Sequence, residues 1–167
     1  MCGIAGYVGQ GDQEVLCRMI AAIKYRGPDD QGIFVRGDVG FAHARLSIID
    51  LSEQGHQPVF NQDKSIAIIF NGEVYNFQEL KEGLLKSGRY NFNSKTDTEV
   101  IIYLYQEFGE KCFEKLNGMF AIAIYDFNKN KLILARDRMG KKPLYWGIFG
   151  STLIFGSELK ALIQHPV

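Results

Sequence analysis

The second residue of the chain, Cys2, is the first candidate for chemistry. Cys2 directly follows Met1, and a small second residue normally permits removal of the initiator methionine, which would leave a cysteine with both a thiol and a free α-amine. An α-amine has an unperturbed pKa of about 7.7–8.0, so near neutral pH a useful fraction can act as the base that activates the thiol. A small buried residue that begins a strand is an equally good interpretation. Position alone leaves both open.

Apolar spacing and turn residues predict the elements that must position such a group. A helix is predicted from Gln13 to Lys24, where apolar residues recur at helical spacing until Gly27-Pro28 ends the pattern. At Thr96-Asp97-Thr98-Glu99 a threonine precedes a glutamate by three positions, which is the capping-box signature of a helix start. Further helical segments are predicted at 77–86 and 112–116, and a helix is closing within 159–167. Strands are predicted at 2–9, 32–35, 39–45, 65–70, 119–126, 131–136, 144–148 and 152–156.

The order of these elements indicates the fold class. Helices are grouped in the first two-thirds of the chain and consecutive strands follow at the end, which differs from the regular alternation of a parallel α/β fold. The pattern favours an α+β sandwich. With 167 residues, the chain is long enough for one domain with a substantial core and short for two.

Composition excludes several classes of function. The formal net charge is zero and the basic residues are scattered, so the sequence offers no electrostatic footprint for nucleic acid or for an anionic membrane surface. No apolar stretch approaches the roughly 18 residues of a spanning helix, and no secretion signal is recognisable at the start. We therefore expect a cytoplasmic protein with a small substrate.

The remaining cysteines and the histidines offer no second site. The three cysteines are odd in number and widely spaced, unlike a disulfide framework or paired zinc ligands. Cys17 and Cys112 are predicted to be small buried residues within helices. His43, His56 and His165 are isolated from other ligand types, so no metal site is predicted.

Several short segments, taken in order, resemble class II glutamine amidotransferase domains. The similarity is greatest to the N-terminal domain of glutamine-hydrolysing asparagine synthetases, and it extends over nearly the whole chain. It implies an N-terminal-nucleophile hydrolase fold, a four-layer αββα sandwich with two antiparallel sheets. The segments are Cys2-Gly3-Ile4, Tyr25-Arg26-Gly27-Pro28-Asp29, Ala42-His43-Ala44-Arg45-Leu46-Ser47-Ile48-Ile49-Asp50, Asn71-Gly72-Glu73-Val74-Tyr75-Asn76, Asp97-Thr98-Glu99, Ala135-Arg136-Asp137-Arg138-Met139-Gly140 and Ser157-Glu158-Leu159-Lys160-Ala161-Leu162.

The resemblance implies that Cys2 is the nucleophile and that two charged residues hold the head group of glutamine. Arg45 would bind the α-carboxylate, a planar cation meeting a planar anion through two hydrogen bonds. Asp97 would accept the α-ammonium group. An exposed ion pair is the alternative for Arg45. Asp97 can also favour a helix N-terminus by interacting with the helix dipole, and both roles are compatible.

Donors to the reaction intermediate are implied at Asn71-Gly72, which follows the apolar run from Ile66 to Phe70. In the family these two residues form the oxyanion hole, although Asn-Gly is also a typical hairpin turn. The resemblance further implies a pocket-edge position for Glu73 and a supporting role for Arg26 beside the cysteine. Backbone groups of one segment would line the glutamine pocket, namely Leu46, Ser47, Ile48 and Ile49.

The implied reaction is hydrolysis of the glutamine side-chain amide to glutamate and ammonia, which needs no cofactor. ATP and Mg²⁺ would be needed only by a synthetase domain that uses the ammonia to make asparagine. The chain has no pyrophosphate-binding motif, and it stops before the final strand expected for the family. We therefore expect a type 2 amidotransferase domain over residues 2–167, cut short at its C-terminal end, with the synthetase domain absent and homo-oligomerisation left open.

Three alternatives remain at this point. The ammonia acceptor could be a sugar or a cell-surface precursor instead of aspartate. The chain could be a non-catalytic module in which Arg45 and Asp97 merely bind glutamine. A conventional cysteine–histidine hydrolase is the third alternative, and it would keep its activity when the N-terminal amine is blocked.

Overall fold

Two antiparallel sheets form the centre of the structure, a computed structural model that describes residues 1–47 and 52–167. The first sheet has the strand order β2-β3-β1-β9-β8 and the second has the order β4-β5-β6-β7. The strands are β1 (Gly3–Val8), β2 (Asp30–Arg36), β3 (Val39–Arg45), β4 (Val59–Phe60), β5 (Ile66–Val74), β6 (Gly118–Asp126), β7 (Lys131–Arg136), β8 (Tyr145–Phe149) and β9 (Thr152–Gly156).

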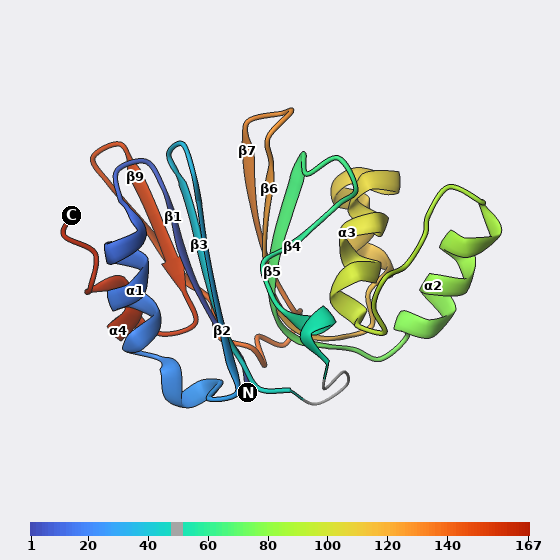
Figure 1. Cartoon of the computed structure of the whole chain (residues 1–167), viewed down its shortest axis with the longest axis horizontal. Helices are drawn as coiled ribbons and strands as arrows, with labels where there is room; N and C mark the ends of the chain where they lie inside the picture. Colours follow the sequence, from blue (N-terminus) through green and yellow to red (C-terminus); the bar gives the residue numbers. More distant parts are fainter. Residues whose placement is uncertain (48–51) are drawn as a thin grey trace.

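Helices cover the outer face of each sheet (Figure 1). On the first sheet lie α1 (Gln13–Ala21) and the short α4 (Leu159–Leu162). On the second sheet lies α3 (Asp97–Phe108), and α2 (Phe77–Lys86) packs against α3. Three 3-10 segments complete the described elements: Lys24–Arg26, Glu53–Gly55 and Gly109–Lys115. The predicted four-layer αββα sandwich is confirmed. No described helix is both long and apolar enough to cross a membrane.

The continuous apolar run in β5 is explained by burial on both faces of its sheet. Ile66 and Ile68 belong to the apolar layer beneath the helices, whereas Ala67 and Ile69 belong to the layer between the sheets. β6 alternates in the same way, with Ile122 toward the helices. Each fully buried large apolar side chain stabilises the fold by about 1.5–3 kcal/mol. The layer between the sheets combines alanines with large aromatic side chains, among them Phe41 and Phe155.

The helix start predicted at Thr96 is confirmed. The Oγ1 of Thr96 accepts a hydrogen bond from the backbone N–H of Glu99 at 3.4 Å. The carboxylate of Glu99 accepts hydrogen bonds from the backbone N–H groups of Asn93 and Ser94, at 2.9 and 2.7 Å. The capping threonine therefore behaves as expected, and the glutamate additionally fixes the loop that enters the helix.

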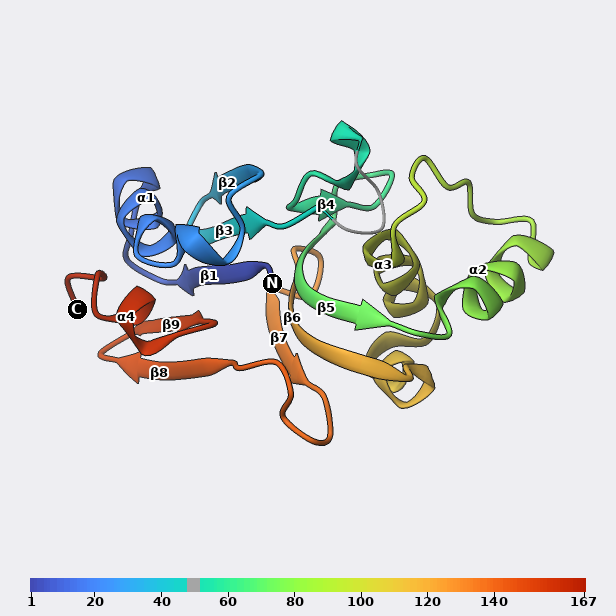
Figure 2. The ribbon, with the colours of Figure 1, turned by 90° about the horizontal axis from the view of Figure 1, so that it is seen from below.

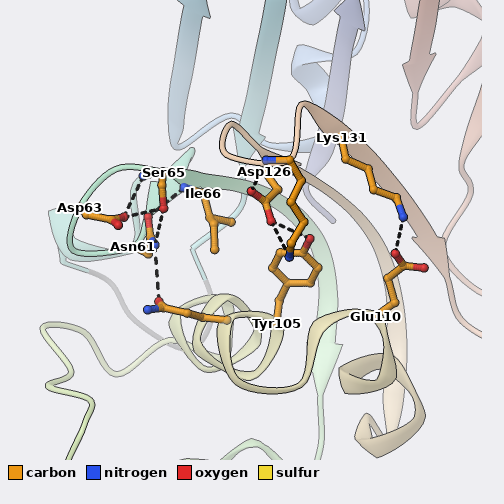
Figure 3. Close-up of polar contacts among 10 residues, drawn as sticks. Asn61, Asp63, Ser65, Ile66, Tyr105, Glu110, Asp126 and Lys131 are labelled. Atoms are coloured by element: carbon orange, nitrogen blue, oxygen red, sulfur yellow. Dashed lines mark hydrogen bonds and ion pairs between the residues drawn. The ribbon is translucent and has the colours of Figure 1, made fainter.

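Polar contacts join α3 to the end of the second sheet that holds the β6–β7 turn (Figure 3). The hydroxyl of Tyr105 donates a hydrogen bond to the Asp126 carboxylate at 3.0 Å, and Lys129 forms an ion pair with the same group at 2.9 Å. In the β4–β5 connection, Asn61 accepts a hydrogen bond from the backbone N–H of Ile66 at 2.9 Å. The Tyr105–Asp126 bond fixes the C-terminal end of α3 against this sheet, and the helix begins at Asp97.

Four local predictions need correction. Cys17 is exposed, because it lies off the face of α1 that buries Leu16 and Met19. The helix that begins at Gln13 ends at Ala21, earlier than the predicted Lys24, and a 3-10 turn follows. The strand that begins near Ile66 continues through Asn71-Gly72 to Val74. The two-residue strand β4 was not predicted. Burial of Cys112 is confirmed.

Candidate active site

A pocket of about 330 Å³ opens beside the N-terminus. In Figure 1 the two sheets converge at the end where the N-terminus lies, and Figure 2 shows the N-terminus between them. The lining comes from strands of both sheets, from the start of α3 and from loops. The residues that line it are Met1, Cys2, Arg45, Leu46, Gly55, Gln57, Phe70, Asn71, Gly72, Glu73, Thr96, Asp97, Thr98, Met119 and Lys142.

Cys2 lies at the start of β1, next to the end of β3. Its Sγ accepts a hydrogen bond from the backbone N–H of Leu46 at 3.3 Å and lies 3.6 Å from the Leu46 carbonyl oxygen. Strand pairing explains this contact, since Gly3 is opposite Ala44 in the β1–β3 ladder. The thiol is half-buried, so it is both held in place and open to the pocket.

Arg26 and the loop that follows it, residues 26–29, contact the segment around Cys2. The Nε of Arg26 donates a hydrogen bond to the Cys2 carbonyl oxygen at 3.0 Å, and its Nη1 forms an ion pair with Glu158 at 2.7 Å. Asp29 in the same loop accepts a hydrogen bond from the backbone N–H of Ser47 at 2.8 Å. The loop thus joins Cys2 to the segment that follows β3, consistent with the supporting role expected of Arg26.

Arg45 is the last residue of β3, and its side chain is buried in the pocket wall. Its Nη1 donates a hydrogen bond to the Ser52 carbonyl oxygen at 2.9 Å. Gly55 lies against the guanidinium group, so closely that a Cβ at position 55 would be 2.0 Å from Nη2. A planar cation held in this way is suited to a carboxylate ligand, and the alternative of an exposed ion pair for Arg45 does not fit its burial.

Asn71 and Gly72 lie inside β5, opposite Ala121 and Phe120 of β6. This excludes the hairpin turn that the Asn-Gly pair also allowed. Asn71 is buried, and its Nδ2 has no hydrogen-bond partner among residues 1–47 and 52–167. A buried amide donor without a partner is costly. Because Asn71 lines the pocket, a ligand oxygen can supply the missing acceptor.

Asp97 begins α3 and faces the pocket with an exposed fraction of only 4%. Its Oδ2 accepts a hydrogen bond from the backbone N–H of Val74 at 3.0 Å. Burial raises the pKa of this carboxyl to about 6, and the nearby Glu73 also raises it, although backbone hydrogen bonds act in the opposite direction. A bound cation would favour the ionised form, so the site is matched to an ammonium group.

The structure brings most of the predicted site residues together. Cys2, Arg45, Leu46 and Asp97 line one pocket with Asn71, Gly72 and Glu73, and Glu73 is the exposed member at its edge. Ser47 does not line it. Ile48 and Ile49 lie outside the described residues.

Two buried polar residues of the pocket were missed in the sequence, Gln57 and Lys142. Gln57 accepts a hydrogen bond from the backbone N–H of Phe70 at 2.6 Å and donates one to Thr98 at 3.3 Å, so it joins β5 to α3. No local pattern marks such a residue, because its partners are far away in the sequence.

Each of the three histidines has a polar contact with a residue other than Cys2. His43 is buried between the sheets with its Nε2 3.1 Å from the Phe70 carbonyl oxygen, and burial lowers its pKa to about 3. His56 and His165 contact Asp30 and Gln10. None of the three lines the pocket within the described part of the chain. In the same part, no group of three or more potential metal ligands is found.

Known proteins resemble the chain in both sequence and structure. A family model described as a glutamine amidotransferase domain matches residues 1–167. "Asparagine synthetase [glutamine-hydrolyzing] 2" of Bacillus subtilis is 46% identical over 99% of this chain and 23% of the relative. A putative asparagine synthetase of Methanocaldococcus jannaschii is 41% identical over 98% of this chain and 35% of the relative. The chain thus spans about a quarter to a third of these relatives.

Among solved structures, the glutamine phosphoribosylpyrophosphate amidotransferase of Bacillus subtilis superimposes with a TM-score of 0.82. The match covers 97% of this chain and 43% of that chain at 22% sequence identity, so it supports the fold alone. The family model, by contrast, covers the whole sequence. The resemblance recognised in the sequence motifs is therefore confirmed, and the chain belongs to the family of glutamine amidotransferase domains.

Proposed function

We propose that this domain hydrolyses the side-chain amide of glutamine to glutamate and ammonia, with Cys2 as the nucleophile. The observation that carries the proposal is the composition of one pocket. It combines a half-buried thiol, an amide donor without a partner among the described residues and two buried groups of opposite charge. Binding an amino acid and hydrolysing its side-chain amide would use each of these features.

The head group of glutamine would be held by charge. Its α-carboxylate would meet the guanidinium of Arg45, and its α-ammonium would meet the carboxylate of Asp97. Both protein groups are almost fully buried, and charges of opposite sign in one pocket favour a zwitterion over a ligand that carries a single charge. Selectivity for an α-amino acid follows from this pair.

The chemical steps follow from the remaining groups once Met1 has been removed. The free α-amine of Cys2 takes the thiol proton, and Sγ attacks the amide carbon of glutamine. The negative oxygen of the tetrahedral intermediate would accept hydrogen bonds from the Asn71 side chain and the Gly72 N–H. The intermediate collapses with loss of ammonia, which takes the proton from the amine. Water then cleaves the thioester to give glutamate and restores the thiol.

We further propose that the ammonia serves asparagine synthesis in partnership with a synthetase domain, which would use ATP and Mg²⁺ to activate aspartate. The curated relatives with 46 and 41% identity are named as asparagine synthetases, one of them as putative. Transfer to a sugar or a cell-surface precursor is the second candidate, since a fold neighbour is named for a different acceptor, phosphoribosylpyrophosphate. The higher identity of the asparagine synthetases favours the first.

The test is release of glutamate and ammonia from glutamine by Met1-free chain. We expect turnover by the wild type and by the C17A variant, whose altered cysteine is exposed on α1, and no turnover by C2A. With aspartate and ATP added, the chain alone should make no asparagine. A folded, Met1-free wild type that binds glutamine without releasing glutamate would favour the binding module instead.

A further inference from the structure

Lys142 is a charged residue of the pocket to which the proposed reaction gives no role. Its exposed fraction is 5%, and its Nζ lies 2.9 Å from Sδ of Met1. It lines the same pocket as Cys2 and Glu73. A lysine almost never lies this deep unless it is paired, because its ammonium group loses hydration. Its position therefore calls for an explanation.

The motif Arg136-Asp137-Arg138-Met139-Gly140 builds the turn that holds Lys142. The carboxylate of Asp137 accepts hydrogen bonds from the backbone N–H groups of Lys141 and Lys142, at 2.8 and 2.9 Å. The Nε of Arg136 donates to the Lys142 carbonyl oxygen at 2.9 Å. Gly140 has a φ of 63°, which favours glycine. The turn thus fixes the backbone of Lys142 from both sides.

Burial and nearby charges both act on the pKa of the Lys142 ammonium group. Burial lowers its pKa, as does the positive charge of Arg26, whereas negative charge on Cys2, Glu73 and Asp137 acts in the opposite direction. Lys142 also lines the same pocket as Cys2, and its Nζ contacts the side chain of Met1, the residue before Cys2. An ammonium group in this position can stabilise an anion that forms in the pocket.

We propose that Lys142 is a positioning residue for the nucleophile, whose buried ammonium group stabilises the negative charge that forms on Sγ of Cys2. The inference rests on the proposed function in taking Cys2 as the nucleophile, and the thiol proton still goes to the α-amine. Met1 shields this interaction in the unprocessed chain, since its sulfur contacts Nζ. Removal of Met1 would expose the lysine to the thiol and to the substrate together.

The test uses four Met1-free proteins: wild type, K142M, K142R and K141M. Methionine at 142 keeps length without charge and arginine keeps the charge, whereas Lys141 is an exposed neighbour that serves as the matched control. The rate of Cys2 alkylation by iodoacetamide is measured from pH 5 to about pH 10. Cleavage on the N-terminal side of Asp12 places Cys2 and Cys17 on different peptides, which mass spectrometry then quantifies separately. Thermal melts establish that each variant is folded.

We expect K142M to slow Cys2 alkylation about tenfold near pH 7, because the charge that stabilises the reacting sulfur is lost. K142R should recover most of the rate, and K141M should match the wild type. A wild-type profile in folded K142M would overturn the proposal, as would K142R behaving like K142M. If K142M does not fold, K142Q provides the uncharged side chain for the same alkylation measurement.

Alkylation requires no glutamine, which separates this inference from the proposed function. A chain whose Cys2 reactivity depends on Lys142 but which releases no ammonia would contradict glutamine hydrolysis and support the role of Lys142. Conversely, ammonia release by K142M at the wild-type rate and with the wild-type pH profile would contradict the role of Lys142 alone.

Discussion

The backbone N–H of Leu46 donates a hydrogen bond to Sγ of Cys2 at 3.3 Å, across 44 residues of sequence. This bond fixes the thiol at the junction of β1 and β3. The nucleophile is therefore positioned by strand pairing, and predictions about activity depend on that ladder as well as on the cysteine.

Retention of Met1 should suppress glutamine hydrolysis. Met1 blocks the α-amine of Cys2 chemically, and its side chain also lines the pocket. Samples with different Met1 content, quantified by intact mass spectrometry, should show ammonia release in proportion to the Met1-free fraction. Full activity in a population that retains Met1 would reject the amine as the base.

Substitution of Arg45 or Asp97 should weaken glutamine binding. Removing one member of a buried charged pair costs about 2–5 kcal/mol, so R45A and D97N should each raise the dissociation constant by a factor of about 30 or more. Calorimetric titration of the C2A background measures binding without turnover. The exposed Arg18 on α1 provides the matched control R18A, and unchanged binding in both pocket variants would refute the head-group assignment.

Glutamine binding should weaken as the pH falls through about 6. Burial raises the pKa of Asp97 to about 6, and only the ionised carboxylate can accept the α-ammonium group. Calorimetry of the C2A protein should show affinity falling with decreasing pH, whereas C2A/D97N should show a weak affinity with little pH dependence over the same interval. Equal pH dependence in both proteins would point to a different group.

Asp97 should also make the free energy of unfolding depend on pH. Its pKa in the folded chain, about 6, is above the ordinary value of 3.8, so the folded state favours the protonated form. The stability from this group is therefore present below about pH 4 and is lost as the pH rises through 6. Urea unfolding should show D97N gaining stability relative to wild type across that window, and a constant difference would contradict the pKa direction.

Asn71 should matter for turnover more than for binding. Loss of one oxyanion donor lowers kcat by about 100- to 1,000-fold in a comparable hydrolase, so N71A should show a loss of this size with a much smaller change in glutamine affinity. Since Nδ2 has no partner among the described residues, its removal costs no described hydrogen bond. A loss of affinity as large as the loss in kcat would assign Asn71 to substrate binding instead.

A substitution at the other end of α3 should separate stability from activity. Y105F removes the hydrogen bond to the Asp126 carboxylate, which costs about 1–3 kcal/mol for a charged acceptor. Thermal melts should show a lower Tm, whereas the KM for glutamine at 25 °C should stay at the wild-type value. A changed KM would show that the two ends of α3 are coupled.

The sequence predicted elements well wherever a local signal was sufficient. The capping threonine at position 96 marks the start of α3, and the continuous apolar run from Ile66 to Phe70 marks β5. Cys17 was wrongly predicted to be buried, although the spacing of Leu16 and Met19 already placed the buried face of α1 elsewhere. Asn71-Gly72 has a turn signature, and only pairing with β6, remote in sequence, keeps it in a strand.

In the pocket too, local motifs predicted which residues take part, whereas their burial depends on contacts with residues far away in the sequence. Arg45 and Asp97 could be named from motifs, but their burial depends on segments that close around them, such as Gly55 against Arg45. Lys142 could not be found, because a lysine after a glycine turn is usually solvated. Its burial follows from the Asp137 turn and from the opposite sheet, and neither leaves a periodic pattern.

The place of β1 in its sheet has a consequence for synthesis. The nucleophile is among the first residues made, yet its strand pairs with β9, which ends at Gly156. At about 5–20 residues per second, a ribosome would need on the order of ten seconds or more to supply that neighbour. We therefore expect no glutamine hydrolysis by a nascent chain until β9 has been made and has paired with β1.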